Sequence, residues 1–270
     1  SFGLDPRVTT VLSKNGIDTP SPIQDQIIPH ILNGRDVIGL AQTGTGKTAA
    51  FLLPLITKTL QEYRRQTLIL TPTRELAIQI EHELKKLTQN ARLYFTTCVG
   101  GTPIGPQIRG LKRKNHFVIG TPGRVEDLID RGVFDPTLVS TVVLDEADRM
   151  LDMGFIHDMR TILKETPTQR ETLFFSATMS KEIEKLVGEF LREPVTVSVK
   201  KRDVTNSIKQ DVVRYEHAHK YDTLLTLLGK PELERVIIFG AMKHSVQKLA
   251  DQLKRGGIAS TAIHGNKSHN

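Results

Sequence analysis

Short apolar runs alternate with segments of helical periodicity over residues 1–195 of the chain. The apolar runs are typical of buried strands, which we expect at 36–40, 67–70, 94–99, 117–119, 141–144 and 172–175. Apolar residues at helical spacing predict helices at 48–60, 74–87, 124–130, 156–163 and 181–191. Because strand and helix alternate repeatedly, we expect a parallel sheet that is covered by helices on both faces.

The pattern is interrupted near residues 199–207, which are mostly polar or charged and lack apolar spacing. This stretch predicts a linker at 200–209, between a first domain at 1–199 and a second domain at 210–270. In the second domain we expect strands at 211–215, 236–239 and 261–263, and helices at 224–228 and 246–253. These elements would open another α/β domain, and we expect the chain to contain only the first part of it.

The turn between the first predicted strand and its helix is rich in glycine and ends in a lysine and a threonine. It fits the P-loop pattern, except that Ala41 stands at the first glycine. Glycines let backbone N–H groups point at phosphate oxygens, and the helix that follows adds its positive end. An ordinary glycine-rich loop is the alternative, but the flanking strand and helix favour a triphosphate site in a RecA-like P-loop NTPase fold. The expected nucleotide-binding residues of this turn are Gln42, Thr43, Gly44, Thr45, Gly46, Lys47, Thr48 and Ala49.

Two acidic residues, Asp145 and Glu146, directly follow the apolar run 141–144. They are expected at the carboxyl end of a buried strand, where open α/β sheets place their ligands. Asp145 and Thr48 can hold Mg²⁺, Glu146 can polarise an attacking water, and Lys47 can reach the β- and γ-phosphates. An acidic pair after a strand can also cap a helix. The upstream turn favours the catalytic interpretation, with Lys47, Asp145 and Glu146 as catalytic residues and ATP–Mg²⁺ as the ligand.

Cysteine content and hydropathy limit where the protein acts. Cys98 is the only cysteine, so no internal disulfide can form and a reducing compartment is favoured. No run approaches the ~20 apolar residues of a membrane span, and the first residues lack a signal pattern. The nine histidines lack metal-ligand spacing, which argues against a zinc site. We expect a cytoplasmic protein without membrane association.

The net charge of +7 is unevenly distributed, because residues 1–195 are almost balanced and the excess lies in 196–270. The first domain is therefore not a general binder of polyanions. Its densest basic segment is 109–114. Such a run is most often a solvated helix face, and an approach to RNA is the less common alternative.

A set of ordered motifs resembles the DEAD-box RNA helicases, bacterial type. The segment 145–155, DEADRMLDMGF, carries the clearest likeness. Further matches in family order are a Q motif within 2–24, then 72–77 (PTRELA), 100–101, 121–124 (TPGR) and 176–178 (SAT). Fainter likeness continues through 236–239 and 263–265. His269 stands where the resemblance leads us to expect glutamine.

The resemblance implies roles for residues outside the P-loop. Gln24 would read adenine with its amide, although a helix cap is the alternative, and Phe2 is first expected as a core or capping residue. Backbone contacts to RNA are implied for Pro72, Thr73, Arg74, Gly101, Thr121, Gly123 and Arg124, several of which can equally cap helices. Coupling between the ATP state and the RNA is implied for Asp148, Ser176 and Thr178. No row of exposed aromatic residues suggests base stacking.

The resulting expectation is an ATP-dependent RNA helicase that acts as a monomer and locally unwinds duplexes. A DNA helicase or translocase on the same fold, or a non-hydrolysing ATP-gated RNA clamp, are the alternatives. Residues 1–270 lack the later family motifs, including arginines that reach the γ-phosphate. We therefore expect this polypeptide to bind ATP or ADP but to unwind little. The particular RNA, the pathway and any protein partners are left open by the sequence.

Overall fold

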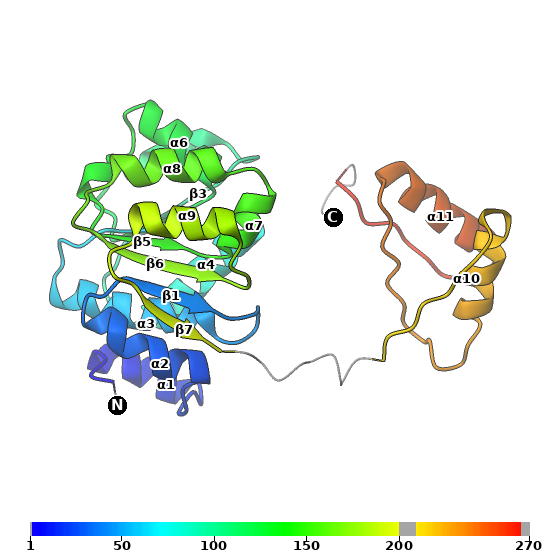
Figure 1. Ribbon diagram of the computed structural model, residues 1–270, viewed down its shortest axis with the longest axis horizontal. Coiled ribbons are helices and arrows are strands. Elements are labelled where there is room, and N and C mark those ends of the chain that lie inside the picture. Colours follow the sequence, from blue (N-terminus) through cyan, green and yellow to red (C-terminus); the bar gives the residue numbers. More distant parts are fainter. Residues whose placement is uncertain (1, 200–208, 266–270) are drawn as a thin grey trace. The chain divides into compact units, whose positions relative to one another are not determined.

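The computed structural model describes residues 2–199 and 209–265. The chain divides into two compact units, 1–206 and 207–270 (Figure 1). The division falls within the predicted linker 200–209, of which only Lys209 is described. His269 also lies outside the described residues.

The first unit is built on a seven-stranded parallel sheet. Its strands are β1 (Val37–Leu40), β2 (Thr67–Leu70), β3 (Phe95–Cys98), β4 (Phe117–Gly120), β5 (Thr141–Leu144), β6 (Glu171–Ser176) and β7 (Val195–Ser198). In space they follow the order β3-β4-β2-β5-β6-β1-β7, and every neighbouring pair is parallel. All carboxyl ends therefore meet at one edge, which we call the carboxyl edge, and all strands begin at the opposite amino edge.

Helices cover both faces of this sheet, so the predicted α/β architecture is confirmed. One face carries α1 (Pro6–Lys14), α2 (Pro22–Leu32), α3 (Lys47–Gln61) and α4 (Arg74–Leu87). The other carries α5 (Ile104–Leu111), α6 (Pro122–Asp130), α7 (Ala147–Asp152), α8 (Ile156–Glu165) and α9 (Lys181–Phe190). A short 3₁₀ turn at Pro136–Leu138 precedes β5.

Strand residues alternate between the two cores. In β4, Phe117 and Ile119 join the α1–α4 core and Val118 joins the α5–α9 core. In β2, Ile69 joins the first core while Leu68 packs in the second. Because both faces are covered, each strand is apolar on both sides, which is why the sequence shows continuous apolar runs rather than alternation.

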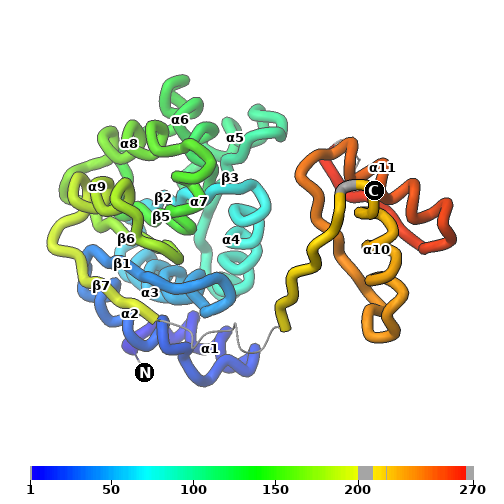
Figure 2. Tube along the Cα trace, turned by 45° about the vertical axis from the view of Figure 1, so that its right-hand side comes forward, coloured from blue at the N-terminus to red at the C-terminus, as the bar shows by residue number. Residues whose placement is uncertain are grey.

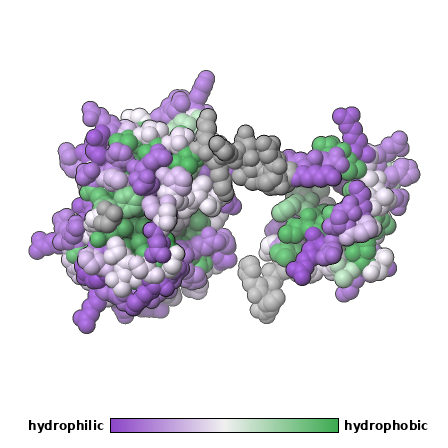
Figure 3. Space-filling view, turned by 90° about the horizontal axis from the view of Figure 1, so that it is seen from below, coloured by the Kyte–Doolittle hydropathy of each residue, from purple (hydrophilic) through white to green (hydrophobic). Residues whose placement is uncertain are grey.

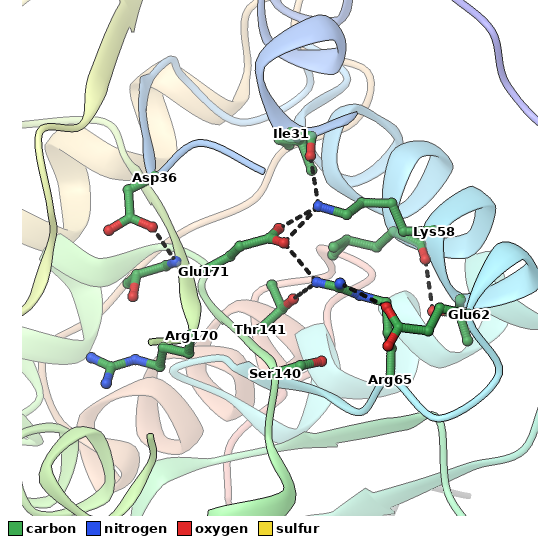
Figure 4. A network of polar contacts seen from close by, with 12 residues as sticks. Ile31, Asp36, Lys58, Glu62, Arg65, Ser140, Thr141, Arg170 and Glu171 are labelled. Atoms are coloured by element: carbon green, nitrogen blue, oxygen red, sulfur yellow. Dashed lines mark hydrogen bonds and ion pairs between the residues drawn. The ribbon is translucent and has the colours of Figure 1, made fainter. Parts of the chain in front are cut away.

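A partly buried ion network joins α3 to the amino edge (Figure 4). Lys58 Nζ donates to both carboxylate oxygens of Glu171, at 2.6 and 2.7 Å, and to the Ile31 carbonyl oxygen at 3.0 Å. Arg65 Nη2 lies 2.6 Å from Glu171 Oε1 and donates to Thr141 Oγ1 at 3.3 Å. Burial, which outweighs the nearby Glu171, lowers the pKa of Lys58. The network fixes the end of α3 against the start of β6.

Some elements of the first unit escaped prediction. Helix α5 is only eight residues long and contains two glycines and a proline, which weaken its periodic signal. Strand β7 lies at the sheet edge and pairs only with β1, and it directly precedes the charged stretch. Helices α1, α2 and α7 were also not among the predicted helices. The other strands and helices α3, α4, α6, α8 and α9 lie where the apolar pattern predicts them.

The second unit contains α10 (Lys220–Leu228) and α11 (Lys243–Arg255), which extend the two predicted helices. The strands predicted at 211–215, 236–239 and 261–263 are wrong for the described residues, where these segments are irregular. Ile237, Phe239 and Ile263 are 82, 93 and 88% exposed. Figure 3 likewise shows hydrophobic residues on the surface of this unit. An apolar run becomes a strand only when a neighbouring strand pairs with it, and among residues 209–265 none does.

Candidate functional site

The loops after β5, β6 and β1 lie side by side, because these three strands are neighbours in the sheet. The glycine-rich turn follows β1, Asp145 and Glu146 follow β5, and Ser176 ends β6. The backbone N–H of Ala41 donates to the Ser176 carbonyl oxygen at 3.0 Å. Residues separated by more than a hundred positions are thereby placed in one site at the carboxyl edge.

The glycine-rich turn adopts a conformation that glycine favours. Gly44 and Gly46 have φ angles of +77° and +93°, and Gly46 is the N-cap of α3. The Thr45 hydroxyl closes the turn by donating to the Gln42 carbonyl oxygen at 2.8 Å. Among the described residues, no backbone N–H from Thr43 to Ala49 has a hydrogen-bond acceptor. Unsatisfied amides at the start of a fifteen-residue helix form an anion site.

A buried charge pair lies beside this turn. Lys47 and Asp145 are 6 and 3% exposed. Burial raises the pKa of Asp145 to about 6, the charge of Lys47 opposes that rise, and Glu146 adds to it. A carboxylate buried with only partial compensation is a fitting ligand for a cation that would supply the missing charge.

Glu146 has an unusual backbone. Its φ and ψ are 52° and 50°, a left-handed conformation that few residues other than glycine adopt. Its carboxylate accepts a hydrogen bond from Arg149 Nη1 at 3.2 Å and is 14% exposed. Strain of this kind is often found where a side chain must be aimed at a reacting group.

Asp148 connects α7 to the end of β6. Its Oδ2 accepts hydrogen bonds from the backbone N–H of Ala177 at 3.1 Å, from that of Thr178 at 3.0 Å and from the Thr178 hydroxyl at 3.0 Å. The Ser176 hydroxyl donates to the Thr178 carbonyl oxygen at 2.7 Å. The structure thus brings together the three residues for which a coupling role is predicted.

Gln24 contacts both its own helix and the glycine-rich turn. Its Oε1 accepts from the Ser21 N–H at 2.9 Å, and its Nε2 donates to the Gly46 carbonyl oxygen at 3.1 Å. The capping alternative is therefore realised. An amide oxygen has two lone pairs and an amide nitrogen two hydrogens, so each atom retains one position for a ligand. Gln24 also lines a cavity of about 420 Å³ together with Phe2, which packs against the core.

A second set of predicted residues follows β2 and β3. Thr73 caps α4 by accepting from the Leu76 N–H at 3.3 Å. Arg74, whose side chain is 34% exposed, lies beside Gly101, which has a φ of +72°. Pro72 is buried, so the structure does not expose this residue for the predicted contact with RNA.

The segment after β4 is held by internal contacts. Thr121 is the N-cap of α6, and its N–H donates to the Cys98 carbonyl oxygen. Gly123 is the second residue of this helix. Arg124 donates to Gln107 Oε1 at 3.0 Å and to the Thr102 carbonyl oxygen at 3.4 Å, and its side chain is 15% exposed. Arg124 therefore stabilises the loop after β3, which contains Gly101, and is only slightly exposed to solvent.

Gln107 was not predicted from the sequence. It is 7% exposed, and its Nε2 donates to the Val99 carbonyl oxygen at 3.0 Å and to Thr102 Oγ1 at 2.8 Å. A buried glutamine that organises the loop next to Gly101 belongs to the site in a positioning role. No local motif marks it, because its partners, the Val99 carbonyl oxygen and the Thr102 hydroxyl, lie eight and five residues away.

The doubly covered parallel sheet, with a glycine-rich turn after β1 and paired acids after β5, has the architecture of a RecA-like α/β domain. The family described as DEAD/DEAH box helicase matches residues 21–186, well over half of the chain. The chain belongs to this family, which confirms the resemblance recognised in its motifs.

Individual relatives agree with this assignment. The ATP-dependent RNA helicase CshA of Listeria monocytogenes is 44% identical over 266 residues, which cover 98% of this chain and 51% of the relative. The DEAD-box ATP-dependent RNA helicase CshA of Bacillus subtilis is 43% identical over 98% of this chain and 54% of the relative. The crystal structure of a DEAD box protein from Methanococcus jannaschii matches with a TM-score of 0.71 and 35% identity, covering 98% of this chain and 72% of that one.

The chain spans about half the length of the curated relatives it matches. Across residues 2–199 and 209–265, no helix combines the length and hydrophobicity needed to cross a membrane.

Proposed function

We propose that this chain is the ATP-binding part of an ATP-dependent RNA helicase. Its family, the names of its relatives and the geometry of the carboxyl edge support the proposal. The observation that carries it is the row of unsatisfied amides from Thr43 to Ala49, next to the buried pair of Lys47 and Asp145. An ordinary glycine-rich loop would leave no buried carboxylate and ammonium beside it.

Each residue of the nucleotide site has a physical role in this proposal. The free amides and Lys47 hold the phosphates, and Gln24 contacts the adenine with the hydrogen-bonding positions that it retains. Thr48 and Asp145 would hold Mg²⁺, which when bound neutralises charge on the phosphates. Glu146 orients the attacking water with its carboxylate. The Arg149 contact and the left-handed backbone fix the direction of that carboxylate.

The RNA side of the proposal uses backbone recognition. Arg74 and the N-termini of α4 and α6 lie at the same edge, where cations and amides can hold phosphates without reading bases. Asp148 and Thr178 join the loop after β5 to the loop after β6. A shift of Glu146 on nucleotide binding would therefore be passed to the end of β6. We further propose that the protein is cytoplasmic, an expectation based on its single buried cysteine, and that it acts as a monomer.

The decisive experiment measures ATP turnover with and without RNA, on the full-length protein and on residues 1–270. We expect RNA to stimulate the full-length enzyme and residues 1–270 to bind nucleotide with little unwinding. Strand displacement is compared on matched RNA and DNA duplexes. Preferential displacement of DNA would instead show a DNA helicase, and displacement that persists in a Glu146→Gln variant would show a non-hydrolysing clamp.

A further inference from the structure

Three loops meet at the amino edge, on the far side of the sheet from the nucleotide site. They precede β2, β3 and β4, which are neighbours in the order β3-β4-β2. The Thr67 N–H donates to the His116 carbonyl oxygen at 2.8 Å, and the His116 N–H donates to the Tyr94 carbonyl oxygen at 2.7 Å. Figure 2 shows β3, the outermost of these three strands, between α4 and α5. The loops therefore form one continuous surface.

Two tyrosines of this surface are presented by a buried histidine. Tyr63 and Tyr94 are 40 and 53% exposed, whereas His116 is fully buried. The His116 ring meets Tyr63 edge-on with centroids 4.3 Å apart and stacks on Tyr94 at 5.7 Å. Its Nδ1 accepts from the Tyr94 N–H at 2.9 Å, and burial lowers the pKa of this imidazole. The Tyr63 hydroxyl also donates to the Arg92 carbonyl oxygen. Both rings are thus held in place while part of each stays open to solvent.

Cations surround these rings. Lys114 Nζ lies 4.4 Å from the centroid of Tyr63, a cation–π contact. Exposed cations also come from each of the three loops, namely Arg64, Arg92, Lys112 and Arg113. Among the residues that the structure describes, none of these cations has an ion-pair partner. The nearest exposed acid in these loops, Glu62, pairs with Arg65 at 3.4 Å.

We propose that this basic–aromatic patch, made of Tyr63, Arg64, Arg92, Tyr94, Lys112, Arg113 and Lys114, is a second contact surface for single-stranded RNA. Exposed rings stack on bases whatever their identity, and unpaired cations beside them attract the phosphates that link those bases. An isolated basic run is usually only solvated. Here the run 109–114 is joined by rigidly held aromatic rings from two other loops, which solvation alone does not require.

The patch is separate from the RNA-contacting residues of the proposed function. A four-residue strand spans about 13 Å, so the two edges are at least that far apart. The choice of RNA as the ligand rests on the proposed function. The patch would hold a flanking single strand while the carboxyl edge acts on another part of the same molecule.

Photocrosslinking tests the proposal directly. A dodecameric oligouridylate containing 5-iodouridine is irradiated with the full-length protein, and modified peptides are mapped. We expect adducts at Tyr63 and Tyr94 in addition to peptides of the carboxyl edge. Adducts confined to the carboxyl edge would overturn this inference and leave the proposed function standing, whereas absence of RNA binding at any site would overturn both.

Affinity measurements with matched variants provide the second test. Fluorescence anisotropy of the same RNA is compared for Lys112→Ala/Arg113→Ala/Lys114→Ala and for a control that removes three exposed cations elsewhere. The control is Lys14→Ala/Lys181→Ala/Lys185→Ala. We expect about a tenfold loss and a salt-dependence slope lower by about two for the patch variant only, because each single-strand phosphate contact contributes about 0.7 to that slope. Equal losses in both variants would contradict a site at the patch.

A tyrosine comparison separates stacking from charge. Tyr94→Ala is expected to weaken RNA binding by about tenfold. Tyr215→Ala, which removes a similarly exposed ring that also lies near a lysine, should leave affinity unchanged. Melting curves establish that both variants are folded. If polyglutamate crosslinks to the patch and the RNA does not, the partner is an acidic polypeptide and the assignment to RNA is wrong.

Discussion

The two halves of the carboxyl edge are prepared for their ligands in different ways. The half formed by β5, β6 and β1 offers backbone amides without partners and a buried charge pair. The half formed by β3, β4 and β2 has side chains that already bind one another, as Arg124 binds Gln107 and the Thr102 carbonyl oxygen. In the first half, the backbone amides have no hydrogen-bond acceptor until a ligand binds. In the second half, hydrogen bonds between the protein's own side chains and carbonyl groups hold the loop after β3 in shape. Loss of a side chain should therefore affect chemistry in one half and structure in the other.

The largest expected effect concerns Glu146. Glu146→Gln keeps the size of the side chain but removes its negative charge, so we expect ATP turnover to fall about 10³-fold, within the range for a lost acid–base group. Nucleotide affinity should remain nearly unchanged, because the amides and Lys47 are intact. Single-turnover hydrolysis and binding of a fluorescent ATP analogue measure the two quantities. Glu165→Gln, an exposed change on α8, is the matched control. A parallel loss of affinity would contradict a purely chemical role.

Arg124 tests the other half of the edge. Arg124→Ala leaves the Gln107 amide oxygen and the Thr102 carbonyl oxygen without a donor, so the free energy of unfolding should fall by about 1–3 kcal/mol. RNA affinity should fall with it, while ATP affinity should not. Urea unfolding and RNA anisotropy measure these effects.

The neighbouring Arg74 is the comparison for that variant. Arg74→Ala should reduce RNA affinity with less than about 0.5 kcal/mol of destabilisation, because its side chain is more exposed and has only a surface partner. If Arg74→Ala and Arg124→Ala destabilise the protein equally, the two arginines do not divide the roles of binding and positioning.

The pKa of the Cys98 thiol measures how well the half formed by β3, β4 and β2 is shielded from water. Burial raises the pKa of this thiol to about 12, from a usual value of 9.0. The folded state keeps its proton where the unfolded state loses it, so stability is unaffected at neutral pH. It falls above pH 9, by up to about 1.4 kcal/mol per pH unit from this group. Unfolding of the protein and of Cys98→Ala between pH 8 and about 10.5 isolates the contribution. An identical pH slope for both proteins would show that the thiol is not shielded.

The smallest expected effect separates functional from incidental backbone strain. Glu146 and Glu193 both have positive φ angles, 52° and 40°. Glu193 lies in the loop before β7, where only its carbonyl oxygen is hydrogen bonded, to Arg35. Glu193→Gly should raise the free energy of unfolding by about 0.5 kcal/mol, because glycine adopts this conformation without strain. Turnover should be unchanged. Thermal melting checks the gain, and a loss of stability would show that the Glu193 side chain contributes contacts.

The half formed by β5, β6 and β1 could be predicted from the sequence far better than the half formed by β3, β4 and β2. Its turn, its lysine and its acids are local patterns after apolar runs, and a buried parallel strand fixes where they meet. The contacts of Gln107 and Arg124 are made with carbonyl and side-chain groups that the folded loop brings near, and no sequence pattern specifies them. The tyrosines of the amino edge were missed for a similar reason. Tyr63 and Tyr94 come from separate loops and are brought together by sheet order.

In the second unit, the sequence predicted strands that the structure does not contain among its described residues. Val236 to Phe239 has the composition of a buried strand, yet in the structure it is irregular and Phe239 is almost fully exposed. The two helices were predictable because their hydrogen bonds are internal to each segment. A strand's hydrogen bonds belong to a pair, and the apolar pattern carries no information about whether the partner is present.

The ion network at the base of α3 has a mechanical consequence. Lys58 lies near one end of a helix whose other end begins at Lys47, and Glu171 begins the strand that ends at Ser176. Sliding this helix along this strand would break several charged hydrogen bonds, which link residues that are only partly exposed to water. We therefore expect displacements on binding or release to occur in the loops of the carboxyl edge, while α3 keeps its position against β6.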